Sequence, residues 1–288
     1  MHPARHQSVI APTPWDGIYW IRSRSAHEFP KHWHDTYGFG TMVDGAHRSA
    51  SGRGPVEAYA GDVIASNPGE IHDGRPLGSP TRSWRMLCID VPAMLRVFGG
   101  RASCGGSMPE LTRPVTRDAE ALRAVSRLFG RLERWTSQRR PTHDTAACDE
   151  ALVETCSLLM TTTDAMRRVA PTVPRAVRLV RERLSDENTA SPSLDEMAAI
   201  AGLSKFQLLR RFERAYGLPP HAWLMRQRAE RARTLIRRGM SLASAAAQAG
   251  FADQSHMSRL FLRHFGFTPG ALRRASAKPP NGSTPASR

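Results

Sequence analysis

The feature that most constrains this chain is an internal repeat in its C-terminal third. Each copy reads as a short helix, a turn that contains glycine, and a second helix rich in basic residues. The glycines of the two turns, Gly202 and Gly250, lie 48 residues apart, and the glycines that follow the second helices, Gly217 and Gly266, lie 49 apart. This spacing predicts two helix-turn-helix units in tandem.

Local sequence signals support the predicted helix starts. Ser193 and Glu196, and then Ser204 and Gln207, have the spacing of a capping box, in which each side chain bonds to the backbone amide of the other residue. Two helices are therefore expected to begin at Ser193 and Ser204. A further helix, from about residue 221 to 238, is expected to join the two units.

The second helix of each unit is predicted to be amphipathic at 100° per residue. In the first unit the inward residues are Leu208, Phe212 and Ala215, and the outward residues are Phe206, Arg210, Glu213 and Arg214. In the second unit the inward residues are Met257, Phe261 and Phe265, and the outward residues are Ser255, His256, Arg259 and Arg263, with Gln254 near the helix start. An outward phenylalanine at position 206 would contact a thymine methyl group or a deoxyribose, or would pack on a neighbouring loop.

A helix-turn-helix unit places its second helix in the major groove of DNA, and two such helices on one side of a duplex lie about one turn, roughly 34 Å, apart. The order of motifs from about residue 173 to 274 resembles the AraC/XylS family of transcription regulators. The matching segments are Ala201 to Ser204, Arg228 to Ala232 with Leu235 and Ile236, Ala249 to Phe251, Ser258 to Phe261, and Phe265 to Pro269.

The resemblance implies which residues read the bases. They are Phe206, Leu209 and Arg210 in the first unit, and Gln254, Ser255, His256 and Arg259 in the second. Lys205, Arg214 and Arg263 on the same helices complete the expected set of DNA contacts. Leu209 departs from the family, in which a polar residue often stands there, so the first unit is expected to read its site more through shape and apolar contact.

Charge distribution favours the same function without the family. From residue 171 to the end the chain has 20 Lys and Arg against 8 Asp and Glu, a net charge of +12 out of the total of +15. A cationic surface releases counterions condensed on DNA, so binding is expected to weaken steeply with salt.

The N-terminal third is expected to form a small β-barrel or sandwich. Short strand-like runs lie between glycine and proline turns, at residues 18–21, 37–43, 56–60, 62–66 and 84–91. The fold class is therefore α+β and multidomain. We expect a barrel at residues 1–105, a helical connector at 106–170, the tandem helix-turn-helix domain at 171–275 and a disordered tail at 276–288.

Within the expected barrel, the segment from His32 to His34, then Gly61 and Asp62, then the segment from Pro68 to His72 resemble the two cupin motifs. The resemblance implies a small-molecule effector site that includes His32, His34, Tyr37 and His72. Three histidines are also capable of binding a divalent metal. The carboxylate that metal-binding cupins place after the His-x-His pair is missing, because Tyr37, Gly38 and Phe39 occupy that stretch, and this argues against metal-dependent catalysis. The alternative to a metal site is that the three histidines belong to an effector pocket or are polar residues hydrogen-bonded in the barrel, and we expect no cofactor.

Other pocket residues remain open at this point. Aromatic and basic side chains that are available to a barrel pocket are Trp15, Tyr19, Trp20, Trp33 and Arg48, and an acidic effector would draw on Arg22, Arg24, Arg48 or Arg85. The alternative is that the aromatic side chains belong to the core of the barrel and that the arginines lie on its surface.

Between the two ends, apolar residues recur at helical spacing from Val115 to Trp135 and from Leu152 to Leu159. The family resemblance implies that these helices carry dimerisation, and the alternative is that they pack on the barrel. We expect a homodimer.

No stretch of 18 apolar residues is present, the N-terminus lacks an apolar signal segment, and Cys88, Cys104, Cys148 and Cys156 are widely spaced. These features predict a cytoplasmic, nucleoid-associated protein with reduced thiols and no membrane partner. The expected function is sequence-specific regulation of transcription in response to an effector, and the resemblance implies activation through RNA polymerase as the commoner mode.

The alternatives are a metal-dependent cupin enzyme with an appended DNA-binding module, a DNA-repair methyl acceptor and an architectural DNA-binding protein. The dispersed cysteines argue against the second, and the pocketed N-terminal domain argues against the third.

Overall fold

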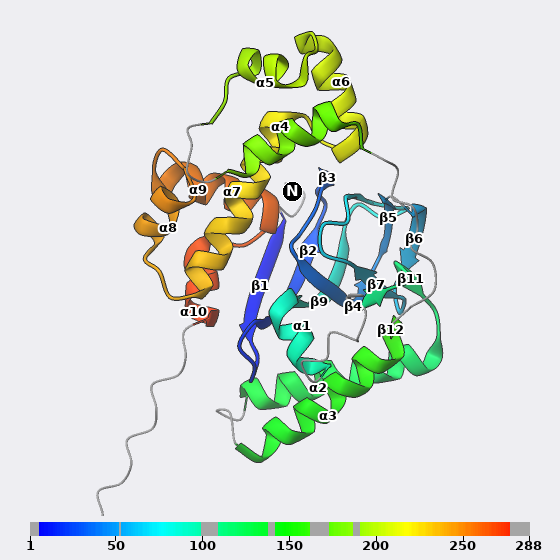
Figure 1. The fold of residues 1–288 in the computed structure, drawn as a ribbon. Coiled ribbons are helices and arrows are strands. Elements are labelled where there is room, and N and C mark those ends of the chain that lie inside the picture. The colour runs from blue at the N-terminus through cyan, green and yellow to red at the C-terminus, as the bar shows by residue number, and fades with distance from the viewer. Residues whose placement is uncertain are drawn as a thin grey trace, which may run out of the picture.

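The computed structural model describes residues 6–51, 53–98, 109–137, 142–161, 173–186 and 191–276. A β-sandwich of cupin-like form lies at the centre, with a pair of helices beneath it and a helical body beside and above it (Figure 1). This arrangement confirms the predicted fold class. The predicted disordered tail, apart from Ser276, and the segment from Ala170 to Thr172 lie outside the described residues.

Two antiparallel sheets form the sandwich. The larger sheet has the order β1-β2-β9-β4-β7-β11, and the smaller sheet has the order β3-β8-β5-β6. The strands of the larger sheet are β1 (Gln7–Pro12), β2 (Ile18–Ser25), β9 (Arg82–Asp90), β4 (Thr36–Asp44), β7 (Val63–Ser66) and β11 (Val115–Thr116). Those of the smaller sheet are β3 (Phe29–His32), β8 (His72–Pro76), β5 (Ala46–Ser51) and β6 (Gly54–Tyr59), and β10 (Glu110–Leu111) pairs with β12 (Met160–Thr161).

Side chains of the larger sheet alternate between two different cores, because successive residues of a strand point to opposite faces. Ile18 and Trp20 of β2, with Leu87 and Ile89 of β9, pack toward the helices below. Their neighbour Tyr19 belongs to a core that it shares with the helical body. Both faces of this part of the sheet are therefore covered.

Two helices lie under the larger sheet, α2 (Ala119–Ser137) and α3 (Thr142–Leu159), and α1 (Val91–Val97) leads toward them (Figure 1). Asp118 caps α2 by accepting hydrogen bonds from the amides of Glu120 and Ala121. Val125, Leu128 and Phe129 bury their side chains against the sheet. The inner faces of both helices thus pack on the barrel, as one of the two alternatives had it.

The helical body contains the predicted tandem units. Its helices are α4 (Arg175–Ser185), α5 (Leu194–Ala201), α6 (Lys205–Tyr216), α7 (Pro220–Arg237), α8 (Leu242–Gln248), α9 (Gln254–Phe265) and α10 (Pro269–Ser276). Both predicted capping boxes are formed, at Ser193 and at Ser204. Each unit's second helix ends at a glycine in the left-handed region, Gly217 with φ of 71° and Gly266 with φ of 75°.

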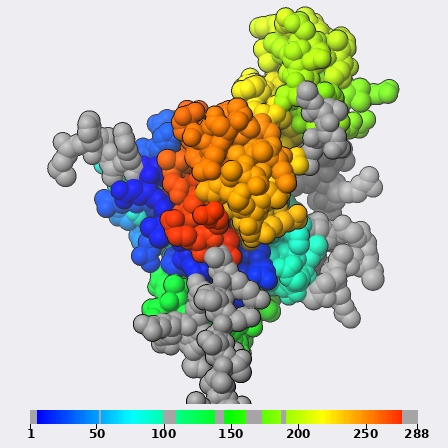
Figure 2. Space-filling view, turned by 90° about the vertical axis from the view of Figure 1, so that its left-hand side faces the viewer, coloured from blue at the N-terminus to red at the C-terminus, as the bar shows by residue number. Residues whose placement is uncertain are grey.

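The two helix-turn-helix units are anchored differently. The first unit packs α4, α5, α6 and the N-terminal half of α7 into a core of its own, around residues such as Leu208, Phe212 and Trp223. The second unit packs α8, α9, α10 and the C-terminal half of α7 into a core that also contains Tyr19 and Cys88 of the barrel. In Figure 2, the orange and red second unit lies directly on the blue N-terminal strands, whereas the yellow-green first unit projects away.

Every predicted strand run corresponds to a strand, but the local pattern did not predict β1, β3, β5, β8 or the short strands β10, β11 and β12. The predicted joining helix is α7. In the part of the chain that the structure describes, no helix has the length and apolar content needed to cross a membrane.

Candidate functional site

The outward face of α6 is basic and carries an exposed aromatic ring. Leu208 and Phe212 are fully buried, which turns the residues between them toward solvent. Phe206 is 67% exposed, and the guanidinium of Arg210 lies 5.6 Å from the centre of its ring. The ring thus lies against the next turn of its own helix. Leu209 is half-exposed on the same surface, and Lys205 pairs with Asp195 at the helix start.

The outward face of α9 has a similar arrangement. Met257, Phe261 and Phe265 are buried, as predicted. Gln254, Ser255, Arg259 and Arg263 are exposed, and His256 is half-buried with its ring 5.4 Å from that of Phe251. Asp253 caps the helix by accepting a hydrogen bond from the amide of His256. The two outward faces therefore present hydrogen-bond donors and cations from rigid, capped helices.

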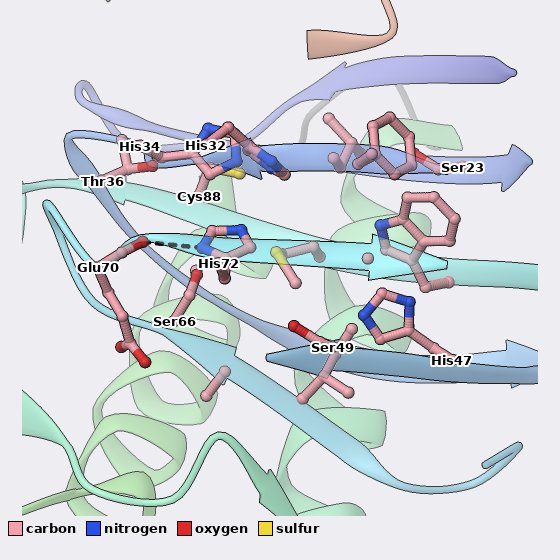
Figure 3. A pocket seen from close by; sticks show the side chains of 18 of the residues that line it. Ser23, His32, His34, Thr36, His47, Ser49, Ser66, Glu70, His72 and Cys88 are labelled. Atoms are coloured by element: carbon pink, nitrogen blue, oxygen red, sulfur yellow. Dashed lines mark hydrogen bonds between the residues drawn. The ribbon is translucent and has the colours of Figure 1, made fainter. Parts of the chain in front are cut away.

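A cavity of about 170 Å³ lies inside the sandwich and reaches the second helix-turn-helix unit. At one end are His32, His34 and His72, and at the other are Ser23, Ser49 and His47 (Figure 3). Between and around them the wall is mainly aliphatic and aromatic, and the helical body contributes Arg233, His264, Phe265 and Phe267. The sandwich alone does not enclose this space.

Hydrogen bonds define the nitrogen atoms that the three clustered histidines offer. Nδ1 of His32 lies 2.7 Å from the carbonyl oxygen of Pro30, and Nδ1 of His72 lies 2.8 Å from that of Glu70. A carbonyl can only accept, so both Nδ1 atoms donate, and each Nε2 is left as an acceptor. His34 differs, because Nη2 of Arg226 donates to its Nδ1 over 2.7 Å.

The histidines around the cavity are held neutral. Burial, with Arg226 and neighbouring imidazoles, lowers the pKa of His32 and of His34 well below the usual value, and burial also lowers the pKa of His72. At the other end, burial lowers the pKa of His6 to about 4 and that of His47 to about 3. Uncharged imidazoles suit a ligand that is mainly apolar and carries a few polar groups.

Ring nitrogens of the three histidines come within 4.8 Å of one another, a spacing that a shared metal ion would require. Three features disagree with a divalent cation. The guanidinium of Arg226 occupies Nδ1 of His34, so the lone pair of that atom is engaged and the other ring nitrogen carries the proton. Arg226 also adds a positive charge beside the cluster, and the cupin carboxylate is replaced by glycine and aromatic residues near Tyr37. The residues present do not fit a metal.

A buried ionic cluster joins α7 to the barrel next to these histidines. Glu230 lies between Arg226, at 2.7 Å, and Arg233, at 3.0 Å, and all three side chains are almost fully buried. Arg233 also pairs with Asp35 and donates to the hydroxyl of Tyr19 over 2.8 Å. The pKa of Glu230 is raised to about 7, because burial outweighs the opposing effect of Arg226. The contact with two guanidinium groups is the geometry expected of an ionised carboxylate.

Other residues that the sequence brought forward lie elsewhere. Tyr37 is 2% exposed in the core between sheet and helices and donates to the carbonyl of Pro109, so it points away from the cavity. Trp15 and Trp20 belong to the same core, whereas Tyr19 lines the cavity. The expectation for Tyr37 is therefore corrected: alternation along β4 sends its side chain to the opposite face of the sheet.

The basic lining also differs from the sequence expectation. Arg22 and Arg48 form ion pairs with Glu133 and Glu57, outside the cavity. The arginines that do line it are Arg82 and Arg233. Sequence reasoning missed both, since a buried arginine carries no signal that separates it from a surface one.

Comparison with known proteins adds family information to this geometry. Residues 197–275 match the model of a helix-turn-helix domain, and residues 17–154 match the model of an AraC-like ligand binding domain. The uncharacterized HTH-type transcriptional regulator YbfI of Bacillus subtilis is 26% identical over 231 residues, which cover 80% of this chain and 82% of YbfI. The transcriptional activator NphR of a Rhodococcus species is 37% identical over 105 residues, 36% of this chain and 30% of NphR.

Solved structures with related chains include two of note. Unsaturated fatty acid bound ToxT from Vibrio cholerae has 14% identity and a TM-score of 0.44, and the match covers 93% of this chain and 94% of ToxT. A probable AraC family transcriptional regulator from Rhodopseudomonas palustris has 29% identity and a TM-score of 0.32, over 35% of this chain and 96% of that one.

Proposed function

Because this chain belongs to the AraC family of transcriptional regulators, with a ligand-binding domain followed by a helix-turn-helix DNA-binding domain, we propose that α6 and α9 read adjacent major-groove segments of one operator. Base edges are read by Phe206, Leu209 and Arg210 of α6 and by Gln254, Ser255, His256 and Arg259 of α9. Lys205, Arg214 and Arg263 contact phosphate or the neighbouring groove wall. As a family, these proteins regulate transcription and are not enzymes.

One observation supports this assignment above the others. Each helix buries one apolar stripe, which includes Leu208 and Phe212 in α6 and Met257 and Phe261 in α9, and turns cations and amides outward. Phe206 is the most exposed of the large apolar side chains on these two helices, since 67% of it faces solvent with Arg210 stacked beside it. A base methyl group and a phosphate would engage that pair together.

The cavity of the ligand-binding domain is proposed to hold the effector, with His32, His34 and His72 as polar contacts. The Nε2 atoms of His32 and His72 are hydrogen-bond acceptors, so they favour a ligand that donates hydrogen bonds at the histidine end of the cavity. An effector that binds one arrangement of the two domains better than another shifts the population toward it, and DNA affinity changes by the same coupling free energy.

A homodimer built on α3 is the proposed assembly. Val153 and Leu158 are 49% and 41% exposed on this helix, on the side turned away from the barrel core. Two copies would contact four major-groove segments, and linkage raises the apparent affinity without new contacts. We further propose the division of the chain at about residues 105, 170 and 275, and action at the nucleoid, where the DNA is.

The test is fluorescence anisotropy on labelled duplexes from upstream of the protein's own gene and its neighbours, with scrambled duplexes as controls, at about 0.15 M salt. Preference for one native duplex by roughly a thousand-fold is expected of a specific regulator. Equal and salt-sensitive binding to all duplexes, with and without cell-extracted small molecules, would contradict sequence-specific reading.

The runner-up, a metal-dependent cupin enzyme with an appended DNA-binding module, is disfavoured by the contact between Arg226 and His34. Elemental analysis of the purified protein checks this directly. Stoichiometric iron, manganese or zinc that is lost in His32→Ala would reverse the order of the two.

A further inference from the structure

The effector cavity is completed by the DNA-binding domain, and it contains a buried cation that has no acidic partner in the part of the chain that the structure describes. Phe265 and Phe267, at the end of α9, line it together with Tyr19 of the barrel. We propose that this junction cavity binds a compact apolar acid, with a ring-sized body against the aromatic residues of both domains and its carboxylate at Arg82. The inference deepens the proposed effector function and rests on it.

Size sets the first limit on the ligand. The cavity measures about 170 Å³, and an apolar protein cavity of about 150 Å³ is known to admit benzene. A single ring with one small substituent therefore fits, whereas a sugar with its hydration shell or a long acyl chain does not. The ligand is compact.

The lining sets the second limit. Ile21, Phe29, Trp84 and Met86 form much of the wall on the barrel side, and Phe265 and Phe267 form it on the side of α9. Phe29 and Trp84 stand edge to face, with ring centres 6.2 Å apart. Such a wall favours an apolar, preferably aromatic, body.

Arg82 supplies the polar end. Its side chain is fully buried and donates from Nη1 to the carbonyl of His27 and from Nη2 to that of Gly74, and its Nε has no hydrogen-bond partner among the residues described. Phe29 and Trp84 lie 5.5 and 5.3 Å from the guanidinium carbon. A buried donor of this kind costs free energy unless an acceptor reaches it, and a carboxylate is the acceptor that also neutralises the charge.

Charge around Arg82 distinguishes it from the other buried arginines. Arg226 and Arg233 share the carboxylate of Glu230. Among the described residues, Arg82 forms no ion pair with a carboxylate, and the exposed Glu28 acts on it only through space. Its lining neighbours His6 and His47 have pKa values lowered to about 4 and 3, so they add no second charge at neutral pH. One positive charge calls for a monoanion.

The body of the ligand would lie against the domain junction. Phe265 is stacked under the ionic cluster, with the guanidinium carbons of Arg226 and Arg233 at 4.8 and 5.5 Å from its ring centre. The ring also packs against Phe261, a core residue of α9, at 4.4 Å. Binding of a ligand in the cavity is therefore coupled to the second helix-turn-helix unit more directly than to the first.

The probes are 4-fluorobenzoate and 4-fluorobenzamide, which share a shape and differ in charge. Binding to the full chain is followed by ¹⁹F NMR. We expect saturable binding of the acid at least ten times tighter than that of the amide, and loss of that preference in Arg82→Gln. Equal affinity for acid and amide, or no saturable binding of the acid, would overturn the inference.

Arg82→Gln removes two hydrogen bonds to carbonyl groups and so tests folding as well as charge. A second pair of variants avoids that difficulty. Val56→Phe fills the cavity from its wall, and Val43→Phe adds the same volume at a site that is 56% exposed and outside the lining. Binding of 4-fluorobenzoate should fall at least tenfold in the first and stay unchanged in the second. Unchanged binding in Val56→Phe would place the acid elsewhere.

Anisotropy on the operator duplex, run on the same samples, separates the two levels of proposal. If the acid binds in the cavity but the protein prefers no duplex, the regulatory role is contradicted and the ligand site stands. Specific DNA binding by a protein that ignores the acid would leave the regulatory role intact and remove the inference.

Discussion

Nη2 of Arg226, on the helix that joins the two helix-turn-helix units, donates a hydrogen bond to Nδ1 of His34, which lines the cavity of the ligand-binding domain 192 positions earlier in the chain. The donor belongs to an almost fully buried ionic cluster with Glu230 and Arg233. Glu230 Oε1 also lies 3.7 Å from Nδ1 of His34, so a ligand that changes the position of the His34 ring acts directly on α7.

Arg226→Met should destabilise the protein strongly, because it leaves the carboxylate of Glu230 buried with one of its two cations removed. Loss of one partner of a buried ion pair costs roughly 3–5 kcal/mol. Arg226→Met combined with Glu230→Leu should recover much of that loss, since no uncompensated carboxylate remains. Urea unfolding of the wild type, both single variants and the double variant measures the coupling. Strict additivity would mean that the two side chains do not interact.

Arg259→Ala should relax DNA specificity at one base position, at a cost of about 1–3 kcal/mol in binding the cognate duplex. Arg259 is exposed on the outward face of α9. Arg273→Ala on α10 is the matched control, because it removes the same charge from an exposed site away from that face. Competition anisotropy against duplexes changed at each position gives the answer. Retained preference at every base in Arg259→Ala would exclude a base-reading role.

Phe206→Ala should weaken binding to the operator while leaving stability within about 0.5 kcal/mol of the wild type, because the ring is 67% exposed. Phe212→Ala, on the same helix but fully buried, should cost about 3–5 kcal/mol of unfolding free energy. Thermal melts and anisotropy on both variants separate the two roles. A large drop in the melting temperature of Phe206→Ala would assign the ring to packing.

Gly266→Ala should loosen the contact between α9 and the barrel. Gly266 has φ of +75°, where a residue with a Cβ costs roughly 1–2 kcal/mol, and that Cβ would collide with the ring of His6. Gly202→Ala carries the same backbone cost at φ of +61°, and its Cβ would meet nothing within 4 Å. Urea unfolding should therefore show the larger loss in Gly266→Ala. Equal losses would mean that the His6 contact contributes nothing.

Stability should decrease as pH falls below about 6.5. Burial lowers the pKa of His6 to about 4 and those of His47 and His264 to about 3. In that window the unfolded chain binds protons that the folded chain refuses, so acid favours unfolding. Glu230 has the opposite sign, since its pKa is raised to about 7 and its contribution is lost as pH rises through that value.

Several histidines have lowered pKa values and, among the described residues, only Glu230 has the opposite effect, so the loss of stability toward acid pH is the larger of the two effects. Denaturant unfolding between pH 7.5 and 5 measures it, and His264→Gln should give a shallower dependence on pH than the wild type. A flat profile in the wild type would show that these imidazoles are not held neutral.

Sequence patterns predicted the helical body far better than the sandwich. Capping boxes at Ser193 and Ser204 are local chemistry, and both formed. The missed strand β8, His72–Pro76, has a polar sequence that ends in proline, and it is a strand because β3 and β5 pair with it. Such pairing depends on residues distant in the chain, which no local pattern reports.

The candidate site was predictable in part for the same reason. His32, His34 and His72 were found through a motif and do converge. Tyr37 was misplaced because a short run of apolar residues does not reveal which face of the sheet each one takes. Arg82 and Arg233 were missed, since their burial depends on partners distant in the chain: Arg82 donates to the carbonyl groups of His27 and Gly74, and Arg233 contacts Tyr19 and Asp35 of the barrel.

Tyr19 and Cys88 sit in one core with Ala229, Phe261 and Phe267. A chimera that grafts this barrel onto the DNA-binding half of another regulator would cut through that core. In the chimera, aromatic side chains of this core would be exposed to water, and the barrel would lose the helices that close its cavity. A transplantable biosensor made from this chain would therefore have to carry α7 to α10 along with the barrel, and exchange only the first unit.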